Sequence, residues 1–378
     1  MVDYLVSLAI YTSIFALFAL GLNLQWGFTG LVNFGHVAFM TVGAYTTVLL
    51  SLKGVPLFIA ALVGGGFAAI LGLIIGFSTL RLREDYLSIV TIGVGELIRL
   101  IVNNQDLPVG DKWISGAFGL QSYPIPLAVF RPSLFSKFLM IGLLTILAAI
   151  ALWQLFLWVK NAQPMLVGDG TRKIGSNQEL ISRLGVAVVF AILSISVYIS
   201  GVISLYNYNP KSGLMLISLI ILALFFWRLE ILLRSPWGRI LKGIREDEEV
   251  PKALGKNVFA YKLQSLMLGG AAAGIAGALF AWQIGAVYPD SFLPQATFDC
   301  WVMVMLGGAG NNIGTILGSV IFFAYDALTR EFLPKIIPLD DARLGAFRIM
   351  VIGLILIVLM VWRPQGVLGK KEELTLGK

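Results

Sequence analysis

The sequence is poor in the residues that build most catalytic and metal centres. It contains one cysteine, Cys300, and one histidine, His36. It therefore cannot form an internal disulfide, a Cys–His nucleophile pair or a cysteine–histidine metal site. We expect no catalytic residue, no bound metal and no cofactor. His36 lies in an apolar run, where a buried structural histidine and a proton relay are both open interpretations.

Charged residues are also scarce. They make up 13% of the 378 residues, whereas 58% are hydrophobic and the mean hydropathy is +0.86. Soluble domains carry about 25% charged residues, so the lipid bilayer must solvate much of this surface. The net charge of +7 then indicates lysines and arginines that flank membrane spans, and it does not predict a nucleic-acid partner.

Motifs for nucleotide hydrolysis are missing from the sequence. The Gly-Lys pairs are followed by Asn257 or Lys371, or end the sequence, so none belongs to G-x-x-x-x-G-K-[ST]. The glycine-rich run 307–314 lacks the βαβ frame of a dinucleotide site. H-E-x-x-H and G-x-S-x-G are absent too. Together with the scattered acids, these absences disfavour a membrane-embedded enzyme.

The apolar runs predict an all-α polytopic membrane protein, a bundle of about 10–11 transmembrane helices with a broken helix pair near 307–314. A span needs about 20 apolar residues. The first run is too long for the core of a signal peptide, so we interpret it as a retained span. The expected spans are about 4–25, 31–51, 56–80, 86–103, 138–159, 184–206, 212–233, 263–286, 297–307, 313–328 and 345–362.

The basic residues predict the orientation. Eleven crossings put the two termini on opposite sides, whereas counting the broken pair as a single crossing gives ten. Most of the 28 lysines and arginines fall on the side of the C-terminus, and residues 1–3 carry none. By the positive-inside rule this distribution predicts an external N-terminus and a cytoplasmic C-terminus.

Small residues predict close packing and an interrupted first helix. Gly72/Gly76, Gly270/Gly274 and Gly314/Gly318 are small-xxx-small pairs, which allow helices to approach closely. Breaks within a membrane are tolerated where the backbone is buried or lines a cavity. The break in the first stretch therefore belongs either to a pathway or to a tight loop; it contains Asn23, Gln25, Trp26, Gly27 and Gly30.

Few charges fall inside the predicted spans. Glu96 and Arg99 lie three residues apart on one helix, so they can pair, either as a structural pair or with a role in gating or substrate passage. Arg228 and Glu230 lie near a helix end, where long side chains reach toward the interface. The candidate translocation-pathway residues are Asn23, Gln25, Asn33, His36, Glu96 and Arg99.

The longest amphipathic loop, 234–262, has features of a docking element. Apolar residues recur at helical spacing, acidic residues precede Pro251, and Gly255 can end a helix. A short exposed helix of this kind fits a groove on a partner protein, and a solvated connecting loop is the alternative.

Several motifs together resemble those of one transporter family. They are Gly21-Leu-Asn-Leu-Gln-Trp-Gly-Phe-Thr-Gly-Leu-Val-Asn-Phe-Gly-His36, Arg81-Leu-Arg-Glu-Asp-Tyr-Leu-Ser-Ile-Val-Thr-Ile-Gly93, Gly95-Glu-Leu-Ile-Arg99, Ile244-Arg-Glu-Asp-Glu248, Leu306-Gly-Gly-Ala-Gly310 and Arg363-Pro-Gln-Gly-Val-Leu-Gly369. The chain resembles the larger, LivM-like permeases of ABC importers for branched-chain and other neutral, hydrophobic amino acids. Urea or short-amide importers use similar permeases, and an ion-coupled secondary transporter is a further alternative that would need an inverted repeat.

The resemblance implies a transport subunit in a bacterial inner membrane, and not an enzyme. It implies a single permease domain over 1–378, with 131–210 as an insertion and 234–262 as a cytoplasmic coupling loop. The implied partners are a sister permease in a heterodimer, two cytoplasmic ABC ATPases, an extracytoplasmic amino-acid-binding protein and membrane lipid. The implied ATPase-coupling residues are Gly238, Arg239, Arg245, Glu246, Asp247, Glu248, Glu249, Ala253 and Gly255.

Overall fold

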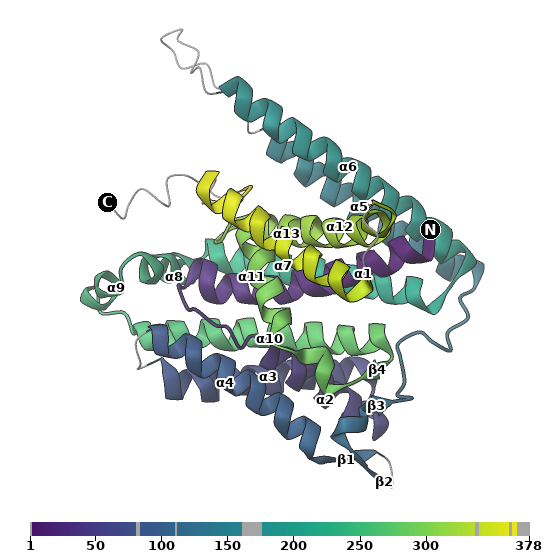
Figure 1. Cartoon of the computed structure of the whole chain (residues 1–378), viewed down its shortest axis with the longest axis horizontal. Helices are drawn as coiled ribbons and strands as arrows, with labels where there is room; N and C mark the ends of the chain where they lie inside the picture. Colours follow the sequence, from purple (N-terminus) through teal and green to yellow (C-terminus); the bar gives the residue numbers. More distant parts are fainter. Residues whose placement is uncertain are drawn as a thin grey trace. The chain divides into compact units, whose positions relative to one another are not determined.

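A computed structural model describes residues 2–80, 84–109, 112–160, 176–336, 340–362 and 365–368, which are mostly helical (Figure 1). The helices are α1 (Val2–Leu22), α2 (Val37–Leu52), α3 (Leu57–Thr79), α4 (Glu84–Asn104), α5 (Leu134–Lys160), α6 (Ser176–Asn207), α7 (Pro210–Arg234), α8 (Pro236–Glu246), α9 (Glu249–Ala253), α10 (Val258–Ile284), α11 (Gln295–Gly307), α12 (Asn312–Ile336) and α13 (Asp341–Trp362). Two small antiparallel sheets pair β1 (Asp106–Val109) with β2 (Lys112–Ser115) and β3 (Leu120–Gln121) with β4 (Ala286–Val287).

The helices confirm the predicted all-α polytopic fold. Within the described residues, nine helices are long and apolar enough to cross a membrane. The other two predicted spans coincide with the shorter helices α2 and α11, of 16 and 13 residues. The basic residues Arg81, Arg83 and Arg363 and the tail from residue 369 lie outside the described residues.

The chain divides into two compact units, the first of which combines Met1–Ile10 with Leu127–Ala223. In this unit α5 packs against α6, and the Lys137 ammonium donates to the Tyr206 carbonyl oxygen at 2.7 Å. Large apolar side chains on both helices are exposed, as expected for helices surrounded by lipid.

The insertion predicted over 131–210 falls within this first unit, and it stays a prediction. Within this range, residues 161–175 lie outside the described residues, and α6 begins at Ser176.

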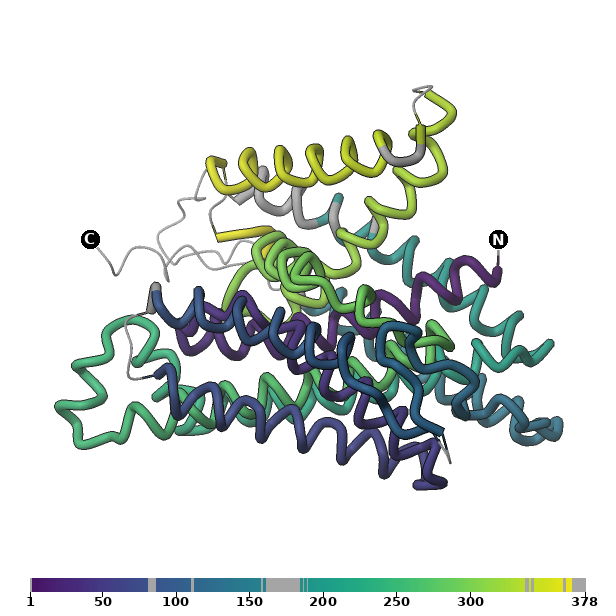
Figure 2. The backbone as a smooth tube through the Cα atoms, turned by 60° about the horizontal axis from the view of Figure 1, so that its bottom comes forward, coloured from purple at the N-terminus to yellow at the C-terminus, as the bar shows by residue number. Residues whose placement is uncertain are grey.

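The second unit, Tyr11–Pro126 with Leu224–Lys378, is built around α10. This helix packs along α2 and α3 (Figures 1 and 2). A Cβ atom at Gly43 would lie 2.1 Å from the carbonyl oxygen of Gly274, and one at Gly72 would lie 3.0 Å from that of Leu266. These distances confirm the close packing that the glycine pairs predict.

The first helix is interrupted where the sequence predicts a break. After α1 the chain forms a π-helical turn, η1 (Asn23–Phe28), and residues 29–36 are non-helical before α2 begins. The turn closes through wide backbone hydrogen bonds, including one from Leu31 N to Gln25 O at 2.8 Å. Single π-helical turns often mark functional sites, so this break is a candidate site.

The second break also forms as predicted, because α11 ends at Gly307 and α12 begins at Asn312. The described C-terminal residues 365–368 return to this break. There, Val367 N donates to Leu306 O and Leu368 N to Gly307 O, each at 3.0 Å. These bonds fix the end of the described chain at the glycine-rich break.

The two ends of α10 carry different structures. The loop with α8 and α9 precedes its first residue and projects at the left of both views, whereas β4 follows its last residue (Figures 1 and 2). The helix has 27 residues and is thus about 40 Å long, enough to cross a bilayer.

Candidate functional site

Three of the predicted pathway residues are buried at the first break, and two of them bond to each other. Asn23, Gln25 and Asn33 are at most 1% exposed. The Asn33 amide donates to Gln25 Oε1 at 2.9 Å, and the Gln25 amide donates to the Leu266 carbonyl oxygen of α10 at 3.1 Å. These bonds fasten the non-helical segment to α10.

His36 lies close by but makes a separate contact. Its Nε2 atom lies 3.1 Å from the Phe18 carbonyl oxygen, and its ring packs between the rings of Phe18 and Phe39. The side chain is fully buried. A partner on the backbone favours the interpretation of a structural histidine over that of a proton relay.

The two helix breaks are joined by a chain of polar side chains. Asn23 Nδ2 donates to Asn312 Oδ1 at 3.2 Å, and Asn23 Oδ1 accepts from Gly310 N at 2.9 Å. Asn312 Nδ2 donates in turn to Glu230 Oε2 at 3.1 Å, and Arg234 Nε donates to Glu230 Oε1 at 3.0 Å. Glu230 was expected only to reach toward the membrane interface. In the structure it links the end of α7 to both breaks.

Glu96 and Arg99 pair as predicted but do not join this network. Arg99 makes two hydrogen bonds to the Glu96 carboxylate, at 2.6 and 3.0 Å, and a third to Asp290 Oδ1 at 3.0 Å. Asp290 belongs to the short helix η3 (Pro289–Phe292), which follows β4. The pair therefore ties α4 to the end of α10 that lies away from α8.

The predicted coupling loop contains two helices. Pro236 occupies the first turn of α8, where its missing N–H costs nothing, and α8 buries Gly238, Leu241 and Ile244 on one face. The indole N–H of Trp237 donates to Gln264 Oε1 of α10 at 2.7 Å. Arg239, Arg245, Glu246 and Asp247 are largely exposed. The first helix is therefore amphipathic and anchored to α10.

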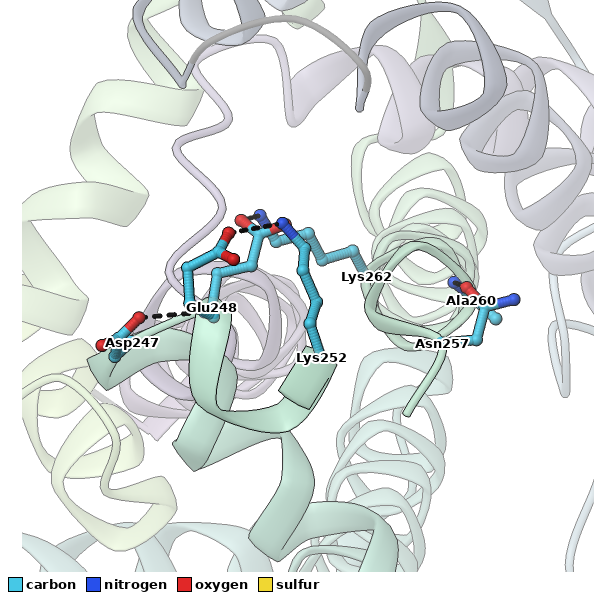
Figure 3. Close-up of polar contacts among 7 residues, drawn as sticks. Asp247, Glu248, Lys252, Asn257, Ala260 and Lys262 are labelled. Carbon is cyan, nitrogen blue, oxygen red and sulfur yellow. Dashed lines mark hydrogen bonds and ion pairs between the residues drawn. The ribbon is translucent and has the colours of Figure 1, made fainter. Parts of the chain in front are cut away.

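An ion-pair cluster orders the second, shorter helix. Glu248 lies between two lysines: Lys262 Nζ is 2.6 Å from its Oε2 atom, and Lys252 Nζ is 3.2 Å from its Oε1 atom (Figure 3). Burial raises the pKa of Glu248, but the hydrogen bonds and charges of Lys262 and Lys252 outweigh it and hold this pKa below its usual value. Asp247 accepts a hydrogen bond from Glu249 N at 2.9 Å, which starts the turn.

The surface of α9 is open. Val250 and Leu254 are 54% and 73% exposed, four residues apart, and Ala253 between them is exposed as well. Gly255 ends the helix at φ +72°, a conformation that favours glycine, and no atom lies within 4 Å of a Cβ placed there. An exposed apolar patch with charged neighbours is suited to protein docking.

The loop touches the first break directly. Arg245 Nη1 donates to the Gly27 carbonyl oxygen at 2.5 Å, and the Lys242 ammonium lies 5.7 Å from the centre of the Phe28 ring. The carbonyl groups of an irregular turn need such donors, because their helical partners are missing. One side chain of the loop thus supports the interrupted helix inside the second unit.

Several contacts in these sites were not anticipated from the sequence. Asn312, Lys262 and Asp290 stand more than ten residues from the side chains that they bind, so spacing gives no signal for them. For Asn312 and Glu230, their position as polar residues in apolar helices was the one sequence feature that could have indicated a buried contact. Among the residues that the structure describes, no group of three or more acidic, histidine or cysteine residues could hold a metal ion.

Comparison with known proteins gives a consistent result along most of the chain. The family profile "Branched-chain amino acid transport system / permease component" matches residues 4–205 and 188–360. The high-affinity branched-chain amino acid transport system permease protein LivM of Escherichia coli is 31% identical over 368 residues, covering 96% of this chain and 69% of that protein. The probable branched-chain amino acid transport permease protein LivM of Methanocaldococcus jannaschii is 23% identical over 380 residues, covering 99% and 96%.

A shorter match concerns a different cargo. The nucleoside ABC transporter permease protein NupC of Lactococcus lactis is 28% identical over 109 residues, 29% of this chain and 33% of that protein. No solved structure matches the chain.

Proposed function

The chain belongs to the permease-component family of branched-chain amino acid transport systems, and we propose that it forms the translocation pathway of an ATP-driven importer for branched-chain or other neutral, hydrophobic amino acids. It is a multi-pass membrane protein. In the proposed complex it pairs with a sister permease in a bacterial inner membrane, two cytoplasmic ATPases supply the energy, and an extracytoplasmic binding protein delivers the amino acid.

The contact between α8 and the first break is the observation that carries the mechanism. The proposed coupling loop presents the apolar residues Val250 and Leu254 outward, while Arg245 holds the Gly27 carbonyl oxygen at 2.5 Å. An ATPase that moves this loop therefore also moves the interrupted helix. Alternating access follows when ATP binding shifts the break between two arrangements.

The C-terminal end supports the proposed orientation. Residues 365–368 bond to the glycine-rich break, where Asn312 binds Glu230, one helical turn before Arg234 ends α7. The described C-terminal residues and the start of α8 thus gather at the same end of the second unit. A cytoplasmic coupling loop then goes with a cytoplasmic C-terminus, and the N-terminus is proposed to lie outside.

The test compares two substitutions at Arg245 in the assembled importer. Arg245→Glu removes the donor to Gly27 and places a carboxylate beside its carbonyl oxygen, so amino-acid uptake should fall about tenfold or more, since a hydrogen bond from a charged group contributes about 1.5–3 kcal/mol. Arg245→Lys keeps the charge and should retain more uptake. The matched control is Arg330→Glu, because Arg330 is exposed and pairs with Asp326 on its own helix.

Gly255 provides a second test of the same loop. Its positive φ favours glycine, and Asn is tolerated there better than most residues, so Gly255→Asn should transport better than Gly255→Asp, which adds a charge to the docking surface. ATP hydrolysis by the co-purified ATPases should lose its stimulation by loaded binding protein in Arg245→Glu and Gly255→Asp. Unchanged uptake and unchanged ATP hydrolysis in both variants would reject the coupling-loop assignment.

A further inference from the structure

The non-helical segment after η1 has a buried side and an open side. Thr29, Leu31, Asn33 and Gly35 are buried, whereas Gly30, Val32 and Phe34 alternate with them and are half-exposed. From Thr29 to Gly35, buried and half-exposed residues alternate one by one. One edge of the break is therefore covered by the protein, and the other is not covered by the described residues.

This segment lies at membrane depth. Phe34 N donates at 3.1 Å to the hydroxyl oxygen of Thr91, the eighth residue of α4. The neighbouring Gln25 binds the carbonyl of Leu266, about 12 Å along α10 from its first residue. Irregular backbone inside a membrane does not face lipid; it is either buried in protein or lines a water-filled cavity. The open side of the segment must therefore meet something other than lipid tails.

A second apolar surface continues this open side. On α11, Phe298 is 42% exposed, and Val302 and Met305 are half-exposed at the spacing of one helix face. The rings of Phe34 and Phe298 lie 5.7 Å apart. We call the combined surface the aromatic face; it consists of Trp26, Val32, Phe34, Phe298, Val302 and Met305.

Trp301 holds the two parts of the aromatic face together from behind. It is 6% exposed, and its ring lies 4.3 Å from that of Trp26 and 5.0 Å from that of Phe34. Its indole N–H donates to the Asn33 carbonyl oxygen at 3.0 Å. This hydrogen bond fixes the Trp301 ring, and the rings stacked on it, to the first break.

The composition of the aromatic face suits an apolar side chain. Its members carry no charge, the aromatic rings offer large rigid contact areas, and the methionine adapts to irregular shapes. The non-helical backbone beside it supplies polar groups of the kind that ammonium and carboxylate groups bind. A neutral hydrophobic amino acid combines these two chemistries.

We infer that the aromatic face lines the translocation pathway and contacts the apolar side chain of the transported amino acid. The inference rests on the proposed function and adds a substrate-contact site to it. Trp26 precedes Gly27, whose carbonyl oxygen binds Arg245, so a movement of α8 also displaces one edge of the site. The aromatic face thus acts as a gate at that end of the pathway where α8 lies.

Photolabelling of the assembled importer tests the contact directly. The probe is a leucine analogue with a diazirine side chain, delivered by the binding protein to proteoliposomes that hydrolyse ATP. Label is expected on peptides that contain residues 26–34 and 298–305. Label confined to other segments would overturn the inference, and this measurement needs no substitution.

Substitution of Phe298 supplies an independent measurement. Phe298→Ala should lower the leucine taken up per ATP hydrolysed about tenfold, the effect expected for one lost apolar contact, and Phe298→Leu should restore most of it. The matched control is Phe67→Ala, because Phe67 is 52% exposed on α3, outside the aromatic face. Equal effects of the two alanine variants would contradict the inference.

Two further outcomes separate the inference from the proposed function. Loss of the sister permease on purification of Phe298→Ala would show that the aromatic face is a subunit contact, which overturns the inference and leaves the proposed function intact. Absence of leucine uptake by the unaltered importer would overturn the proposed function itself, and the inference with it.

Discussion

The polar chain between the two helix breaks can be tested by a double-mutant cycle. Asn23 is fully buried and Asn312 is 3% exposed, and the Nδ2 atom of the first lies 3.2 Å from the Oδ1 atom of the second. Asn312→Leu removes this bond and the one to Glu230. Hydrogen bonds between transmembrane helices contribute about 0.6 kcal/mol on average and up to about 1.7 kcal/mol. Two such bonds predict a loss of about 1–3 kcal/mol in the free energy of unfolding.

The double-mutant cycle separates the energy of the Asn23–Asn312 hydrogen bond from the other effects of each substitution. We expect Asn23→Leu, Asn312→Leu and the double variant to give a coupling energy of about 0.6–1.7 kcal/mol, because the second substitution no longer removes a shared bond. The assay is unfolding of the purified chain in mixed micelles by titration with SDS, followed by circular dichroism.

A matched control is available on α4. The Asn104 side chain is exposed and donates only to Leu100 O of its own helix among the hydrogen bonds of the described residues, so Asn104→Leu should change the free energy by less than about 0.5 kcal/mol. If Asn312→Leu is as mild as Asn104→Leu, and the coupling energy is zero within error, the polar link between the breaks does not stabilise the protein.

Two further predictions concern packing and pH. Gly43→Ala should destabilise the chain by about 1–3 kcal/mol in the same unfolding assay, because its Cβ would lie 2.1 Å from the Gly274 carbonyl oxygen. Gly66→Ala should not destabilise it, because no atom lies within 4 Å of a Cβ placed there. Equal effects of the two substitutions would contradict the close α2–α10 contact. The pKa of Glu248 is lowered in the folded protein, so its ion pairs stabilise α9 fully at pH values above the unfolded pKa of about 4.3. This stabilisation is lost as the pH falls through the lower folded pKa. Hydrogen exchange of residues 247–255, corrected for intrinsic rates, should therefore accelerate in that acidic window. Glu248→Gln should remove this pH dependence, and an unchanged dependence in that variant would refute the assignment.

The sequence was sufficient for the helices and for both breaks. Inside a membrane the backbone of a long apolar run must satisfy its own hydrogen bonds, which favours a helix. Each expected span accordingly coincides with a helix. The clusters of amide residues and glycines at 23–30 and 307–312 were strong signals because an amide side chain without a partner is costly inside a membrane. The ends were less well defined: the span expected from residue 31 begins as a helix only at Val37.

The sites were predictable as local patterns but not as contacts. Glu96 and Arg99 could be paired because three residues separate them on one helix. The bonds from Arg245 to Gly27 and from Lys262 to Glu248 depend on where the loop folds back onto the helices, which no local spacing encodes. The coupling loop was expected to hold one short helix, and the structure shows two, α8 and α9, because Asp247 adopts an extended conformation between them.

The source of energy is the most direct test of the proposed function. Uptake of labelled leucine should be measured in proteoliposomes that contain this chain with its sister permease and ATPases, with binding protein outside and ATP inside. We predict uptake that requires ATP hydrolysis and persists when ionophores collapse all ion gradients. Uptake that continues without ATP and disappears with the gradients would contradict the proposal and identify a secondary transporter.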